Sequence, residues 1–227
     1  VTFQISTGAT DLAGNGLAST ATVSYRVRRR NTANFYATSA QDSLQGYTSS
    51  TTACGTATAS AGATVAAAGD RSNIYAPISM WRGYMTFSIA PLASLADVNI
   101  VSAYLYATQT ACPGNPYTTT FGSAIEAWHV NYGPTFEAAD CSSSNLGGRQ
   151  YTLSKDTVLE VKSVAVTAAV QDDFANRVSR GSRSQFRIQT ANAITDNDTV
   201  NDYCNFATNT ASTTTNRPYL RITYEYD

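Results

Sequence analysis

Charged residues are scarce in this chain of 227 residues. They make up 14% of the sequence, against about a quarter in an average soluble domain, and the formal net charge is −1. Binding of DNA or RNA requires clustered lysine and arginine side chains, so nucleic acid is not an expected partner. Long apolar runs are missing as well, and no stretch of about 18 apolar residues could cross a bilayer. The sequence therefore predicts no membrane span.

Catalytic motifs are also sparse. The single histidine, His129, follows Trp128 in an expected strand, and no G-x-S-x-G motif accompanies it. Glu126, Glu137 and Asp140 surround this strand. Two of them could form the acid and base of a glycosidase, which stand about 5 or 7–9 Å apart. A structural histidine and a non-catalytic protein without a cofactor are the preferred interpretation.

The four cysteines show no C-x-x-C spacing, which argues against a zinc site and a thioredoxin-like motif. Two disulfides are predicted instead, and they imply an oxidising, extracellular location at a cell surface. Four cysteines allow three connectivities. The favoured one joins Cys54 to Cys112 and Cys141 to Cys204, because each pair connects polar loops that flank expected strands.

Apolar and polar residues alternate in several segments, which is typical of strands with one buried and one solvent-exposed face. The clearest are residues 82–90, 101–109, 184–191 and 217–226. The main helical candidate is residues 163–178, where Val166, Val170 and Phe174 can share a face. We therefore predict an all-β protein, a jelly-roll-like β-sandwich with an N-terminal β-hairpin extension and at most one short helix.

Long polar loops are expected between these strands. They cover residues 48–70, 110–122, 131–148 and 194–205, and one cysteine falls in each. The last of them holds the best candidate metal ligands, Asp196, Asn197, Asp198 and Asp202. Calcium is the ion that such oxygen ligands suit, but the spacing matches no EF-hand loop, and a solvated turn is the preferred interpretation.

The opening of the chain predicts a hairpin of its own. Strands over 1–7 and 19–27 flank the stretch ATDLAGNGLAS, residues 9–19. Asp11 and Asn15 are expected to hydrogen-bond the turn backbone, with calcium binding by these two as the alternative. Gly14 and Gly16 are expected to supply positive φ.

Two resemblances accompany these patterns. The opening stretch resembles the last hairpin of bacterial Ig-like repeats. Residues 31–227 resemble secreted jelly-roll modules of the DNRLRE type, related to family 96 carbohydrate-binding modules, through RGYMTFSIAPLASLADVNIVSAYLYA, IEAWHV, VKSVAVTAAVQDDFAN and RPYLRITYEY. The resemblances imply a hairpin extension over 1–30, a sandwich module over 31–227, and binding of carbohydrate by the module.

Two functions follow as hypotheses. In the preferred one, the chain is a structural subunit that assembles with copies of itself, head to tail, into a filament, tube or layer. In the alternative, it is a carbohydrate-binding or adhesive module of a larger surface protein. The arginines of the RVRRR stretch either form a solvated joint or pair with carboxylates of a neighbouring subunit. The expected subunit contacts are Val1, Phe3, Ile5, Val23, Tyr25, Arg28, Arg29 and Arg30.

Overall fold

The computed structural model describes residues 2–24, 26–37, 46–50, 54, 57–73 and 76–227, and within them strands predominate. The strands are β1 (Thr2–Ile5), β2 (Ala21–Ser24), β3 (Arg29–Tyr36), β4 (Gly46–Ser50), β5 (Thr58–Ala61), β6 (Val65–Asn73), β7 (Ala76–Ser88), β8 (Asn99–Ala111), β9 (Ile125–Val130), β10 (Asn145–Ser154), β11 (Val161–Ala165), β12 (Arg183–Thr190), β13 (Asp202–Ala207) and β14 (Tyr219–Tyr226). The helices are α1 (Ala90–Ala93) and α2 (Thr167–Ala175), with 3-10 turns η2 (Ala138–Ser142) and η3 (Thr214–Asn216).

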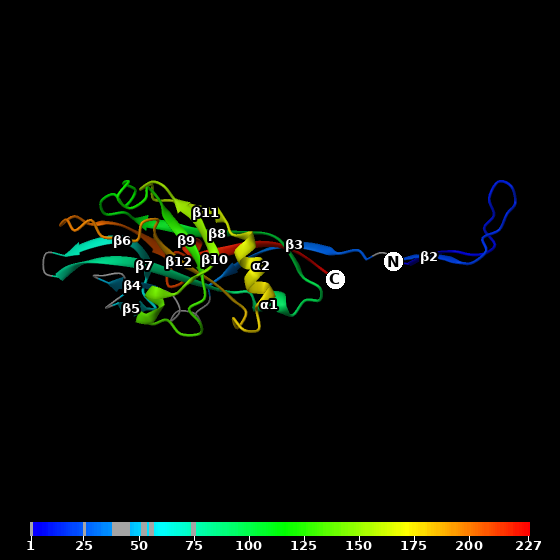
Figure 1. Ribbon diagram of the computed structural model, residues 1–227, viewed down its shortest axis with the longest axis horizontal. Helices are drawn as coiled ribbons and strands as arrows, with labels where there is room; N and C mark the ends of the chain where they lie inside the picture. The colour runs from blue at the N-terminus through cyan, green and yellow to red at the C-terminus, as the bar shows by residue number, and fades with distance from the viewer. Residues whose placement is uncertain (1, 25, 38–45, 51–53, 55–56, 74–75) are drawn as a thin grey trace.

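The body of the molecule is one curled antiparallel sheet. Its main path runs β10-β9-β12-β7-β6-β13-β8-β14-β3, with β11 beside β8, and β4 between β5 and β7. The inner faces of both ends of this path meet in a single apolar cluster, which includes Phe87 of β7, Phe186 of β12, Leu105 of β8 and Leu220 of β14. The predicted all-β, sandwich-like fold is confirmed, and the N-terminal hairpin lies outside the body (Figure 1).

The predicted strands all form, but one of them is enclosed on both faces. β8 and β14 alternate buried and accessible positions as expected. In β12, by contrast, every residue from Ser184 to Thr190 is buried. The chain after β9 covers the second face, where Tyr132 packs against Tyr84 of β7. Gln185 is satisfied there, because it accepts the Tyr132 N–H at 3.0 Å and donates to Thr86 Oγ1 at 3.1 Å.

The prediction of a loop over residues 48–70 is wrong for the second half of this segment. This segment carries β5 and most of β6, a strand between β7 and β13. Ala66, Ala67 and Ala68 are fully buried. A Cβ atom on Gly83 of β7 would lie 2.9 Å from Ala66, so the strands approach too closely for larger side chains. Composition typical of a flexible loop is here a consequence of tight packing.

The helices are short. α2 forms inside the predicted segment, with Val166 and Val170 buried against the core and Phe174 partly buried. One helix more than predicted is present, the single turn α1, which has Pro91 in its first turn and Leu92 buried. Within the described residues, no helix is long and apolar enough to cross a membrane.

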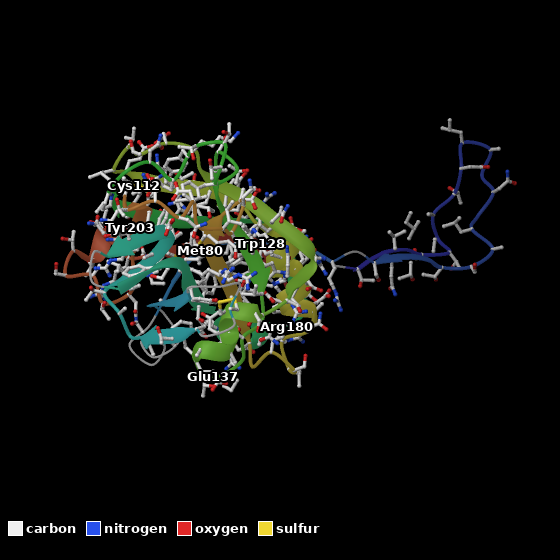
Figure 2. The ribbon with its side chains drawn as sticks, turned by 60° about the vertical axis from the view of Figure 1, so that its left-hand side comes forward. Met80, Cys112, Trp128, Glu137, Arg180 and Tyr203 are labelled. Carbon is white, nitrogen blue, oxygen red and sulfur yellow. A yellow bond between two sulfur atoms is a disulfide. The ribbon has the colours of Figure 1, made fainter. Side chains whose placement is uncertain are left out.

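Two disulfides form, but the favoured pairing is wrong. Cys54 bonds Cys141, and Cys112 bonds Cys204. The strand order explains the second bridge, because β13 lies beside the end of β8, with Asn205 opposite Ala111. Figure 2 shows Cys112 near Tyr203 at one end of the body, and the Tyr203 N–H donates to the Pro113 carbonyl at 3.2 Å.

Candidate assembly surface

The N-terminal hairpin is a two-stranded ribbon that projects from the body (Figure 1). β1 and β2 pair antiparallel, and the Thr2 and Ser24 hydroxyls lie 3.1 Å apart on one face. The alternation of side chains places Gln4 and Thr22, which are register partners, on that same polar face. The register partners Ile5 and Ala21 belong to the opposite face.

The opposite face of the ribbon is apolar and uncovered. Ile5 is 54% exposed and Val23 is 61% exposed. None of the described hairpin residues contributes to the buried clusters of the body. An isolated two-stranded ribbon is only marginally stable in water, so this face gains free energy by packing against another surface.

The turn of the hairpin is stabilised by one carboxylate. Asp11 Oδ1 accepts the N–H groups of Ala13 at 2.8 Å and Asn15 at 2.9 Å, and its Oδ2 accepts the Asn15 amide at 3.1 Å. The hydrogen bonds from Asn15 lower the pKa of Asp11. Gly14 has the expected positive φ of 83°, but Gly16 does not, because it pairs with Thr10 in a β-bridge instead.

The arginine stretch forms the joint between hairpin and body. Arg26 contacts Asp227 at 2.5 Å and Asp97 at 3.3 Å, and Arg28 also pairs with Asp97. Arg30 lies 3.9 Å from Glu225. These carboxylates belong to the same chain, so the arginines form intrachain ion pairs where the hairpin joins the body. Exposed pairs of this kind contribute about 0–1 kcal/mol each.

The expected subunit contacts divide into three groups. Ile5 and Val23 are exposed on the ribbon, and Arg28, Arg29 and Arg30 lie at the joint and the start of β3. The backbone of Phe3 pairs with Val23, while its side chain is outside the described residues. Val1 and Tyr25 lie outside them as well.

A row of tyrosines crosses the outer face of β3, β14 and β8. The Tyr219 ring lies 5.0 Å from that of Tyr36 and stacks on that of Tyr106 at 4.6 Å between centroids. Arg221 lies over Tyr106 at 5.6 Å. Glycan recognition by stacking requires a free ring face. Tyr106 and Tyr219 cover one ring face of each other, whereas Tyr36 is tilted against Tyr219 and is exposed. Tyr104, on the same strand β8 as Tyr106, is also exposed.

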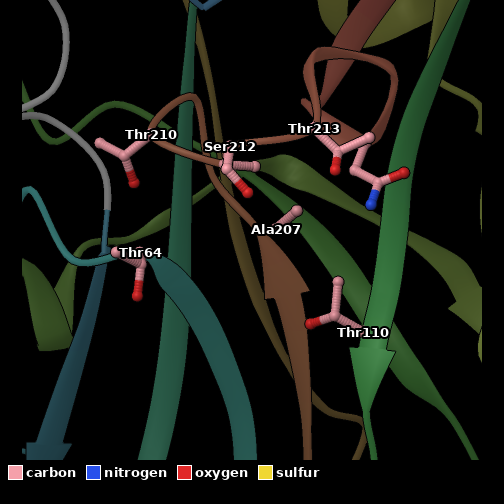
Figure 3. A pocket seen from close by; sticks show the side chains of 8 residues that line it. Thr64, Thr110, Ala207, Thr210, Ser212 and Thr213 are labelled. Atoms are coloured by element: carbon pink, nitrogen blue, oxygen red, sulfur yellow. The ribbon is translucent and has the colours of Figure 1, made fainter.

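A shallow hollow of about 340 Å³ lies beside β13 (Figure 3). Its walls carry hydroxyls, methyl groups and one amide, and none of its lining residues is charged or aromatic. The hollow can therefore offer hydrogen bonds to a ligand, but it has no aromatic ring on which a sugar could stack. The lining residues are Thr64, Thr110, Ala207, Thr210, Ala211, Ser212, Thr213 and Asn216.

His129 belongs to a buried ionic network. Its Nε2 lies 2.9 Å from Asp173 Oδ1, and neither side chain reaches solvent. Arg180 donates to the same oxygen at 2.6 Å, and Ser184 donates to Asp173 Oδ2 at 2.6 Å. His129 Nδ1 has no hydrogen-bond partner among the described residues. The structural role expected for His129 is consistent with this burial, although only one ring nitrogen is satisfied.

Removal of Asp173 is expected to be strongly destabilising. Asp173→Asn leaves His129 and Arg180 without their buried carboxylate, which should lower the free energy of unfolding by about 3–5 kcal/mol. The adjacent Asp172→Asn is the matched control. Asp172 is partly exposed and pairs with Arg149 and Arg180, so its substitution should lower the free energy of unfolding by at most about 1 kcal/mol. Urea denaturation of both variants measures the difference, and equal losses would contradict it.

The carboxylates near Trp128 are engaged locally. Glu126 accepts the Trp128 indole N–H at 2.9 Å. Glu137 and Asp140 form a capping box at the start of η2, where Asp140 accepts the Glu137 N–H at 2.7 Å. Burial raises the pKa of Asp140. Trp128 itself is half-buried, and Arg187 covers its ring at 5.1 Å.

The predicted metal ligands are brought together in part. One ligand oxygen from each of Asp196, Asp198 and Asp202 lies within 4.8 Å of the others. Asn197 has a φ of 62°, and its amide oxygen accepts the hydroxyl of Thr195 at 3.2 Å. The carboxylates therefore converge, whereas the Asn197 side chain is engaged within the loop.

Comparison with known proteins gives no family assignment. No protein-family model matches the chain, and no curated protein matches it significantly. The function must therefore be argued from the geometry of this chain, and the projecting hairpin is the feature that most clearly lacks a partner among the described residues.

Proposed function

We propose that this protein is a non-catalytic, extracellular structural subunit that assembles with copies of itself, head to tail, through its N-terminal hairpin. One observation carries the proposal. The hairpin projects from the body with an uncovered apolar face that includes Ile5 and Val23 (Figure 1). Full burial of an aliphatic side chain contributes about 1.5–3 kcal/mol, so a receiving surface on a second copy would stabilise the contact.

The positions of donor and open edge favour a linear polymer. Among the described strands, β5 pairs with β4 alone and leaves one edge open. Figure 1 places β4 and β5 in the half of the body that is distal to the hairpin. A strand donated to such an edge adds backbone hydrogen bonds, as in β-strand addition. A contact between two different surfaces does not close on itself, so it propagates into a filament or tube.

The extracellular location is supported by the disulfides. All four cysteines are bonded in pairs, and disulfides persist mainly in oxidising compartments. The two bridges would therefore persist in subunits assembled outside the cell.

Substitutions on the two faces of β2 test the proposal. Val23→Lys places a charge on the apolar face, where burial in a partner costs several kcal/mol. We expect it to raise the critical concentration for assembly by about tenfold or more. Thr22→Lys adds the same charge to the opposite, polar face and should assemble nearly as the unaltered chain does. Sedimentation and negative-stain microscopy measure the polymer in each case.

Two results would overturn this function. Equal assembly by Val23→Lys and Thr22→Lys would show that the apolar face is not the contact. An unaltered chain that stays monomeric and binds a glycan array would favour the alternative, a carbohydrate-binding or adhesive module. The tyrosine row of Tyr36, Tyr106 and Tyr219 is the surface to mutate in that case.

A further inference from the structure

Three carboxylates converge in the loop before β13 and at its start, and a fourth, that of Asp70 on β6, lies against this loop. Asp196, Asp198 and Asp202 form the group whose ligand oxygens lie within 4.8 Å of one another. Asp70 of β6 is the register partner of Asp202 on β13. Its Oδ2 accepts the N–H of Asp196 at 3.2 Å, so its carboxyl lies against the loop that carries the others.

Each of the three clustered carboxylates has one oxygen fixed by a backbone amide. Asp196 Oδ1 accepts the N–H of Asp198 at 3.3 Å, and Asp198 Oδ1 accepts that of Val200 at 2.7 Å. Asp202 Oδ1 accepts the N–H of Asn115 at 2.5 Å. These bonds orient the groups and leave the second oxygen of each carboxylate for another ligand.

Asp70 is the decisive member of this acidic cluster. Its side chain has no solvent exposure, and its Oδ1 has no hydrogen-bond partner among the described residues. A buried carboxylate oxygen without a hydrogen bond is costly, so a cation bound at this oxygen would be stabilising.

No side-chain cation in the described part of the chain compensates the cluster. Among the described residues, no lysine, arginine or histidine nitrogen lies within 4.0 Å of a carboxylate oxygen of Asp70, Asp196, Asp198 or Asp202. Like charges so close together repel, and a divalent cation removes that repulsion while it coordinates the free oxygens.

The surrounding backbone is held closely. Gly114 has a φ of 72°, and a Cβ atom there would clash with the Asn201 carbonyl oxygen. The loop that holds Asn115 therefore packs directly on the start of β13. The amide oxygen of Asn201 is a second buried acceptor without a partner in the described part of the chain. The backbone next to Asp202 is therefore constrained by this close packing.

We propose that Asp70, Asp196, Asp198 and Asp202 bind one calcium ion. All four offer oxygen ligands, and calcium accepts six to eight of them, including backbone carbonyls and water, in flexible geometry. Magnesium demands a smaller, nearly octahedral shell and gives up its water reluctantly, so it should bind more weakly. The ion would fasten the loop before β13 to the end of β6. Figure 1 places this loop, drawn in orange, at the end of the body opposite to the hairpin.

Calorimetric titration of the full chain with calcium chloride, after removal of metal by a chelator and dialysis, tests the site. We expect one ion per chain with a dissociation constant of about 0.1–1 mM, the range of extracellular calcium modules. Asp198→Asn and Asp70→Asn should each weaken binding by about 10–100-fold.

Asp156→Asn is the matched control. Asp156 accepts the N–H of Val158 at 3.0 Å, the same local bond that Asp198 makes with Val200. It lies in the loop before β11, where it pairs with Lys162. This variant should bind calcium as the unaltered chain does. Absence of calcium binding by the unaltered, folded chain would overturn the proposal, and so would equal affinity in Asp198→Asn and Asp156→Asn. Circular dichroism establishes that each variant is folded.

Discussion

Reduction of both disulfides is expected to lower the free energy of unfolding by about 5–9 kcal/mol. The bridges join residues 87 and 92 positions apart. In the chain-entropy account, closing loops of this length restricts the unfolded chain by about 4–5 kcal/mol each. The two loops overlap in sequence, so the combined loss is smaller than the sum. A domain is typically stable by about 5–15 kcal/mol, so reduction should remove most of that margin.

Paired substitutions separate the two bridges. Cys112→Ala with Cys204→Ala releases β8 from β13 in the core, while Cys54→Ala with Cys141→Ala releases the segment that holds η2. Each pair should lose about 2–5 kcal/mol in urea denaturation. Titratable thiols in the native protein, or unchanged stability after complete reduction and alkylation, would contradict this prediction.

The pairing itself could not be derived from the sequence. Local composition around the cysteines indicated that each lies in or near a loop, and it carries no information about which loops meet. Cys112 forms a disulfide with Cys204 because β13 lies next to β8, although the two cysteines are 92 residues apart in the chain. Contacts of such large sequence separation are decided by strand order, which periodicity does not reveal.

Strands with a regular alternation were predictable because burial on one face leaves a period of two. β8 and β14 illustrate this. β6 did not show it, because alanine and glycine fill a position where neighbouring strands approach closely. The alternation in β12 predicted one solvent-exposed face, but its polar side chains are buried under the chain that follows β9. Gln185 is satisfied there by hydrogen bonds.

The candidate sites were predictable only in part. The sequence identified the aspartates of the 194–205 loop, but Asp70 is more than 120 residues away in the chain and reaches them only through the pairing of β6 with β13. The hairpin was evident from its turn residues. The resemblance of residues 31–227 to DNRLRE-type modules stays a prediction.

Deletion of residues 1–27 is expected to abolish self-assembly while the body stays folded. The described residues of the deleted segment contribute nothing to the core, and their ion pairs with the body are those of Arg26 with Asp97 and Asp227. Loss of these two pairs should cost about 2 kcal/mol or less, so the truncated chain should still unfold cooperatively as one folded body. Light scattering should then report monomers at concentrations where the full chain forms polymers.

The truncated chain also tests the direction of assembly. It lacks the donor hairpin but keeps the receiving surface, so in a mixture it should occupy the hairpins of growing ends and shorten the polymers of the full chain. A synthetic peptide of residues 1–27 should act at the other end, because it fills the receiving surface without offering one of its own. Both additives should therefore terminate growth, and both together should neutralise each other by pairing. Polymers of unchanged repeat from the truncated chain alone would mean that contacts between bodies hold the subunits together, and the hairpin would then be a spacer.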